Sequence, residues 1–111
     1  MISSVGKFTV TTPGTLVRLT SGQTTPAAKY SCHAIMVQAL PANVGKVYIG
    51  TSAMSRAALT GLYAILPLPS TTSIPVFTAA LTLAPNSLNL ADLFIDADNA
   101  NDGVIVTLLI N

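Results

Sequence analysis

The sequence lacks glutamate and tryptophan, contains one cysteine and one histidine, and carries few charges of either sign. Charged residues make up 8% of its 111 residues, whereas an ordinary soluble domain contains roughly 25%. The single cysteine excludes an internal disulfide framework. One histidine and no glutamate leave few groups for acid–base chemistry, so we expect that the chain is not an enzyme. The absence of tryptophan counts against a carbohydrate-binding module, because sugar-binding platforms favour large aromatic faces.

The chain is apolar on average but has no long apolar run. Its mean hydropathy is +0.63, yet its most apolar window, residues 62–68, is far shorter than the roughly 18–20 residues that a membrane span requires. No cationic segment followed by an apolar run stands at the start, so we expect no signal peptide and synthesis in the cytoplasm. A net charge of +1 provides no attraction to nucleic acid or to an anionic membrane. These features indicate a structural or assembly protein that hides much of its surface against other proteins.

Composition and turn residues predict one all-β domain that spans residues 1–111. Val, Ile and Thr are abundant, and these β-branched residues favour strands. Proline and glycine recur at short intervals, which leaves segments long enough for strands but too short for most helices. The expected fold class is therefore a small antiparallel β-sandwich. Residues 1–12 are expected to form either an edge strand or an N-terminal arm that contacts a partner, since termini are often ordered only by partners.

Alternation of apolar and polar residues places the expected strands along the chain. They cover residues 7–12, 15–20, 30–40, 46–51, 62–66, 75–83, 93–97 and 104–110. In the third of these, Ile35, Val37 and Ala39 share one face, and Met36 and Gln38 share the other. Residues 52–58 are the one place where a short helical turn could compete.

The clearest turn signal lies in residues 98–103. Asp102 and Gly103 tolerate the positive φ angles of tight hairpin turns, so we expect the final two strands to form a hairpin. The last strand, residues 104–110, is apolar on both faces. That pattern predicts either a central strand of a sheet or a strand between subunits.

Two runs of residues are typical of a known class of proteins. They are Val-Gln-Ala-Leu-Pro-Ala-Asn-Val-Gly-Lys-Val-Tyr-Ile-Gly at 37–50 and Leu-Ala-Asp-Leu-Phe-Ile-Asp-Ala-Asp at 90–98. Both resemble small β-sandwich virion proteins of tailed bacteriophages, above all the head decoration (cement) proteins. The resemblance implies a jelly-roll-like fold, a homotrimer, and binding to the major capsid protein on the outer surface of the virion, with no catalytic residue and no cofactor. Tail-tip, baseplate and head-fibre proteins look similar and stay as alternatives.

Asp96, Asp98 and Asp102, together with Asn99 and Asn101, form the densest group of oxygen ligands. Ca²⁺ prefers such ligands, but the spacing does not match an EF-hand loop. One interpretation is a weak cation-binding loop. A second is a turn that is rich in Asp and Asn because those residues tolerate turn conformations. A third is a set of interface carboxylates that face the basic first half of the chain.

Other candidate residues are few. Cys32 and His33 are neighbours, and on a strand their side chains point to opposite faces, so they form no catalytic dyad. We expect a packed cysteine and a half-exposed histidine, and the alternative is a zinc or nickel ion shared by His33 side chains of several subunits around a symmetry axis. Five scattered cations without an aromatic platform argue against nucleic-acid binding. The candidates for an interface with another subunit or partner are Phe8, Val10, Tyr30 and Tyr48.

Overall fold

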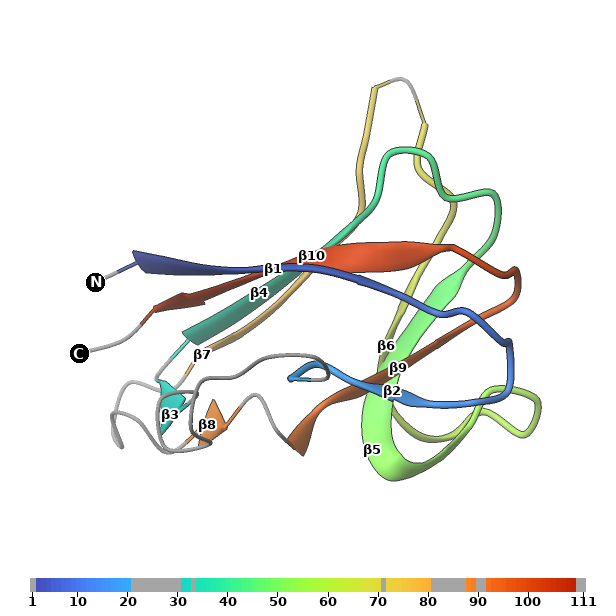
Figure 1. The fold of residues 1–111 in the computed structure, drawn as a ribbon, viewed down its shortest axis with the longest axis horizontal. Coiled ribbons are helices and arrows are strands. Elements are labelled where there is room, and N and C mark those ends of the chain that lie inside the picture. Colours follow the sequence, from blue (N-terminus) through green and yellow to red (C-terminus); the bar gives the residue numbers. More distant parts are fainter. Residues whose placement is uncertain are drawn as a thin grey trace.

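A computed structural model describes residues 2–20, 31–32, 34–70, 72–80, 88–89 and 92–109 of the chain. Two four-stranded antiparallel sheets form the two layers of the fold, and a small two-stranded sheet lies at one end (Figure 1). The predicted all-β sandwich is therefore confirmed. The described residues contain no helix that is long and apolar enough to cross a membrane.

Ten strands make up the described part of the fold. They are β1 (Ile2–Thr9), β2 (Val17–Arg18), β3 (Ser31–Cys32), β4 (Ala34–Ala39), β5 (Val47–Ser55), β6 (Thr60–Leu66), β7 (Val76–Ala80), β8 (Leu88–Asn89), β9 (Phe94–Ala97) and β10 (Gly103–Leu109). Sheet A has the order β1-β10-β4-β7, and sheet B has the order β2-β9-β5-β6. The N-terminal segment is thus an edge strand of sheet A.

The strands pair as one long antiparallel ribbon that folds back on itself. The first strand pairs with the last, and the pairing continues inward through β2 with β9, β3 with β8 and β4 with β7 to the hairpin of β5 and β6. Winding this ribbon places β10 beside β4 and β9 beside β5. A two-stranded ribbon wound into two packed sheets is a jelly roll, which is the fold that the resemblance implied.

The core between the sheets follows from the alternation along the strands. Ile35, Val37 and Ala39 are buried as predicted, while Met36 between them is exposed. The last strand, β10, is central in sheet A, as its apolar pattern predicted. The buried cluster draws on both sheets and on residues adjacent to β1, β2 and β9: Phe8, Val10, Leu19, Ile35, Val37, Ala39, Val47, Ile49, Leu66, Leu93, Ile95, Ala97, Val104, Val106 and Leu108.

The predicted final hairpin is wrong, because β9 belongs to sheet B and β10 to sheet A. Residues 98–102 therefore cross from one layer to the other, as do residues 10–16 and 40–46. Asn101 takes the positive φ, at 71°, in place of Asp102 or Gly103. Glycine is needed at 103 for a different reason, since a Cβ there would collide with the carbonyl oxygen of Phe8.

These three crossing connections bond to one another at one end of the sandwich. The Nδ2 group of Asn43 donates to the carbonyl oxygen of Gly103 at 2.9 Å, and the Gly103 N–H donates to Oδ1 of Asn43 at 2.9 Å. The connection of residues 10–16 bonds to the connection of residues 98–102 through the backbone. The Val10 N–H donates to the carbonyl oxygen of Asp102 at 2.9 Å, and the Asn101 N–H donates to the carbonyl oxygen of Val10 at 2.7 Å.

The side chain of Asp102 completes this set of contacts. Its carboxylate accepts the backbone N–H of Val44 at 3.1 Å and that of Gly45 at 2.8 Å. Asp102 is 4% exposed, and a carboxylate removed from water requires such partners. The Asn and Asp residues of these turns therefore hold the two layers together at this end.

Residues 52–58, where a short helical turn was the alternative to a strand, belong to the hairpin of β5 and β6. β5 stays extended to Ser55, and the chain reverses only at residues 56–59. Leu59 ends the turn with a positive φ of 57°. Ser55 at the end of β5 pairs with Thr60 at the start of β6, which closes the hairpin around this turn.

Candidate functional site

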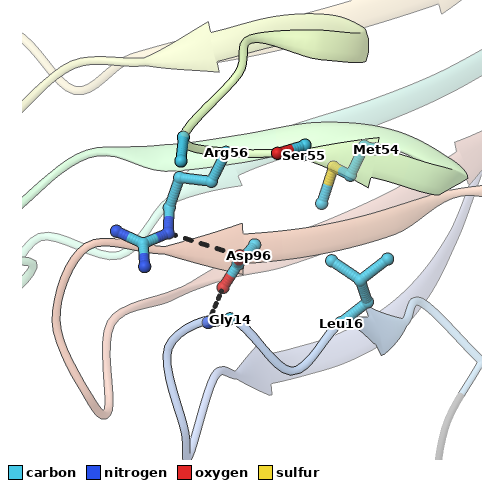
Figure 2. A pocket seen from close by; sticks show the side chains of 7 residues that line it. Gly14, Leu16, Met54, Ser55, Arg56 and Asp96 are labelled. Carbon is cyan, nitrogen blue, oxygen red and sulfur yellow. Dashed lines mark hydrogen bonds and ion pairs between the residues drawn. The ribbon is translucent and has the colours of Figure 1, made fainter.

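An open pocket of about 320 Å³ on sheet B contains the main cluster of charged side chains. Figure 2 shows the Asp96 carboxylate between the Arg56 guanidinium and the backbone nitrogen of Gly14. The pocket is lined by Gly14, Leu16, Met54, Ser55, Arg56, Ala57 and Asp96. The site thus joins the loop before β2, the end of β5 and the strand β9.

The Asp96 carboxylate is fully engaged by protein groups. Its side chain is 3% exposed, and Oδ2 accepts a hydrogen bond from Nε of Arg56 at 3.3 Å. Oδ1 accepts the N–H of Gly14 at 2.9 Å and that of Ala97 at 2.8 Å. Three donors compensate for the loss of water around this charge.

Arg56 extends the cluster to a second carboxylate. Its Nη1 donates to Oδ1 of Asp98 at 2.9 Å, and this hydrogen bond raises the pKa of Arg56. The hydroxyl of Tyr48 also donates to Asp98, at 3.2 Å. Burial raises the pKa of Tyr48, and the nearby charge of Asp98 raises it further. Tyr48 therefore acts as a neutral hydrogen-bond donor.

Gly50 has no side chain, which allows β5 to approach β6 closely. A Cβ on Gly50 would meet the carbonyl oxygen of Gly61 and would lie 2.9 Å from Sδ of Met54. The pairing register with β6 also shifts on both sides of Gly50. Gly50 therefore lies in close contact with Gly61 and Met54, in the same hairpin that carries Arg56 to Asp96.

The three aspartates of the predicted cation loop do not converge on one point. Asp96 and Asp98 face a guanidinium, and Asp102 faces the amides of Val44 and Gly45. Within the described ranges, no group of three or more His, Cys, Asp or Glu side chains is placed to hold a metal ion. Asp102 fits the interpretation of a turn rich in Asp and Asn, because its carboxylate binds backbone amides. Asp96 and Asp98 instead contact Arg56, a basic residue of the same chain.

The candidate interface residues lie mostly inside the molecule. Phe8 and Val10 are 5% and 0% exposed and belong to the core. Their apolar pattern reflects packing between the two sheets, so their side chains are withdrawn from any partner. Tyr48 is 7% exposed and bonds to Asp98. Tyr30 and His33 lie outside the described residues.

The sequence did not point to the outer face of sheet A, where Lys7 on the edge strand is the one charged residue of the two rows described below. The pairing register aligns two rows of outward residues across the sheet. One row is Lys7, Ile105, Gln38 and Val76, and the next is Ser4, Thr107, Met36 and Thr78. Lys7 stands at the end of its row, on the edge strand. Only the strand order could reveal these rows, because their members come from four distant segments.

The chain matches no protein-family model, no curated protein and no solved structure.

Proposed function

We propose that this chain is a structural protein of a bacteriophage virion, which binds the outer surface of the assembled capsid and stabilises it. The jelly roll supports the proposal, because this architecture is common among viral capsid and lectin domains. The low charge of the whole chain also supports it, since the centres of protein interfaces are depleted in charged residues.

The observation that carries the proposal is the outer face of sheet A. Ile105 is 37% exposed, Met36 is 39% exposed and Val76 is 46% exposed, and Gln38, Thr78 and Thr107 lie between them without charge. A sheet face of this kind offers apolar contact together with hydroxyl and amide hydrogen bonds. Such a face suits a broad, shape-matched contact with a large protein surface.

The test uses particles from the source of the chain and the purified protein. Particles are separated on a density gradient, and the number of copies of this chain per particle is determined by quantitative mass spectrometry. Hundreds of copies on filled heads, with lower particle stability after stripping, are expected. A few copies per particle would instead assign the chain to a tail tip, baseplate or head fibre, and absence from all particle fractions would overturn the proposal.

Variants then test whether the outer face of sheet A is the contact. Stripped particles are mixed with wild-type protein, with Ile105→Asp or Met36→Asp, and with the control Leu59→Asp. Leu59 is 60% exposed in the hairpin turn, and aspartate tolerates its positive φ. Rebinding is expected to weaken by about tenfold or more for the two face variants, since a charge buried in an interface is costly, and to stay unchanged for the control.

A further inference from the structure

The exposed apolar side chains gather at one edge of the sandwich. Nine large apolar side chains of the described residues are exposed, and five of them follow one another along β6, the next connection and the start of β7: Tyr63, Ile65, Leu68, Ile74 and Val76. β6 is the edge strand of sheet B and β7 is the edge strand of sheet A. We call this surface the β6–β7 edge.

This edge is also free of charge. The sequence has no Asp, Glu, Lys or Arg between Arg56 and Asp92. In β6, Leu62, Ala64 and Leu66 are the more buried residues, while Tyr63 and Ile65 are exposed. Among the described residues, no backbone hydrogen bond of a β-ladder joins the outer edge of β6 to another strand. Within the described part of the chain, β6 therefore presents unpaired backbone groups next to uncharged apolar side chains.

The opposite edge has the features that prevent pairing with another molecule. β1 carries the exposed Lys7 and an irregular register between Ser4 and Gly6, and β2 is two residues long and carries the exposed Arg18. Charged side chains, bulges and short strands are the usual means of protecting a sheet edge. β6 also has an irregular register, because Tyr63 is an extra residue between the partners of Ile49 and Gly50. Unlike the opposite edge, however, it carries no charge, and it is seven residues long.

We infer that the β6–β7 edge is covered by a second copy of this chain, with β6 of one copy antiparallel to β6 of the other. An uncharged edge is complementary to another uncharged edge, and the chain itself supplies one. Antiparallel pairing of identical strands about a two-fold axis is self-complementary, since each contact occurs twice. The pairing would join the two copies of sheet B into one continuous sheet, with Tyr63 and Ile65 against their counterparts. The inference does not depend on a capsid partner.

The first test is the oligomeric state of the purified chain by sedimentation velocity over a range of concentrations. We expect a dimer, and we expect Ile65→Lys to weaken its association about tenfold or more, because a lysine on an edge strand opposes edge-to-edge pairing. The matched control is Ile105→Lys, which adds the same charge at a residue of similar exposure on the central strand β10. A monomeric wild-type protein at millimolar concentration would overturn the inference, as would equal effects of the two variants.

The second test identifies the strand at the dimer axis. Tyr63 is the middle residue of β6, so in the antiparallel pair it lies close to its own counterpart. Tyr63→Cys in a Cys32→Ser background is expected to form a disulfide-linked dimer under mild oxidation, because paired strand residues lie within disulfide range. Ser52→Cys, at an exposed position on β5, is the control. Dimers that cross-link no better through Tyr63→Cys than through the control would contradict β6 pairing.

Discussion

Replacing Asp102 with alanine removes the carboxylate that bonds the end of sheet A to the connection before β5. Asp102 is 4% exposed, and its oxygens accept the N–H groups of Val44 and Gly45 at 3.1 and 2.8 Å. The variant keeps the backbone bonds of residue 102 but leaves both amides without this acceptor. The substitution therefore isolates one side-chain contribution to the contact between the layers.

The two lost hydrogen bonds differ in their cost. Gly45 is buried, so its N–H cannot turn to water, and losing a charged acceptor there costs about 1.5–3 kcal/mol. Val44 is 67% exposed, so its N–H can bond to water and the loss is about 0.5–1 kcal/mol. The sum, about 2–4 kcal/mol, is a large part of the roughly 5–15 kcal/mol that stabilises a typical domain.

Urea unfolding followed by far-ultraviolet circular dichroism measures this loss. With a slope of about 1.5 kcal/mol per molar urea, the midpoint is expected to fall by about 1.3–2.7 M. Asp102→Asn retains one carbonyl acceptor and should lie between wild type and alanine. Asp92→Ala, at an exposed position, is the control and should stay within about 0.5 kcal/mol of wild type. A loss for Asp102→Ala no greater than that of the control would refute the reasoning.

Two further substitutions test the other contacts. Gly103→Ala is expected to destabilise the fold by about 1–3 kcal/mol, since its Cβ would collide with the Phe8 backbone; an unchanged urea midpoint would mean that β1 does not approach β10 there. Tyr48→Phe should cost about 1 kcal/mol at neutral pH through the lost bond to Asp98. Burial raises the pKa of folded Tyr48 above its ordinary value of 10.0, so the contribution of its protonated form is complete below pH 10 and is lost as the pH rises above that value. Wild-type protein should therefore lose stability more steeply than the variant in alkaline urea titrations, and parallel curves would contradict the placement of Tyr48.

Local pattern predicted most of the strands and, in β4, which face is buried. It missed β8, the first five residues of β1 and the last four of β5. Ile35, Val37 and Ala39 alternate with more exposed neighbours, and strand geometry converts that alternation directly into an inner and an outer face. The apolar character of β10 on both faces likewise predicted its central place. Turn residues marked where the chain leaves each strand. The all-β class and the sandwich followed from these features.

Strand partners were decided only by the tertiary structure. Residues 98–102 look like a hairpin turn, yet they connect two different sheets. A turn sequence specifies a change of direction, whereas the choice of partner strand depends on side chains from distant segments that compete for the same core. The apolar pattern of Phe8 and Val10 fits a core as well as an interface, and only packing distinguishes the two.

The candidate site also combines features that the sequence predicted with features that only the tertiary structure decided. The sequence by itself determined that the carboxylates are clustered near the C-terminal end and the cations lie in the first half. It did not determine that Asp96 meets Arg56, because forty residues separate them and only the pairing of β5 with β9 places the β5–β6 hairpin beside Asp96. The long uncharged segment before Asp92 was visible in the sequence, but its position on two sheet edges was not. Composition is a local property, whereas an edge exists only once every strand has found its neighbours.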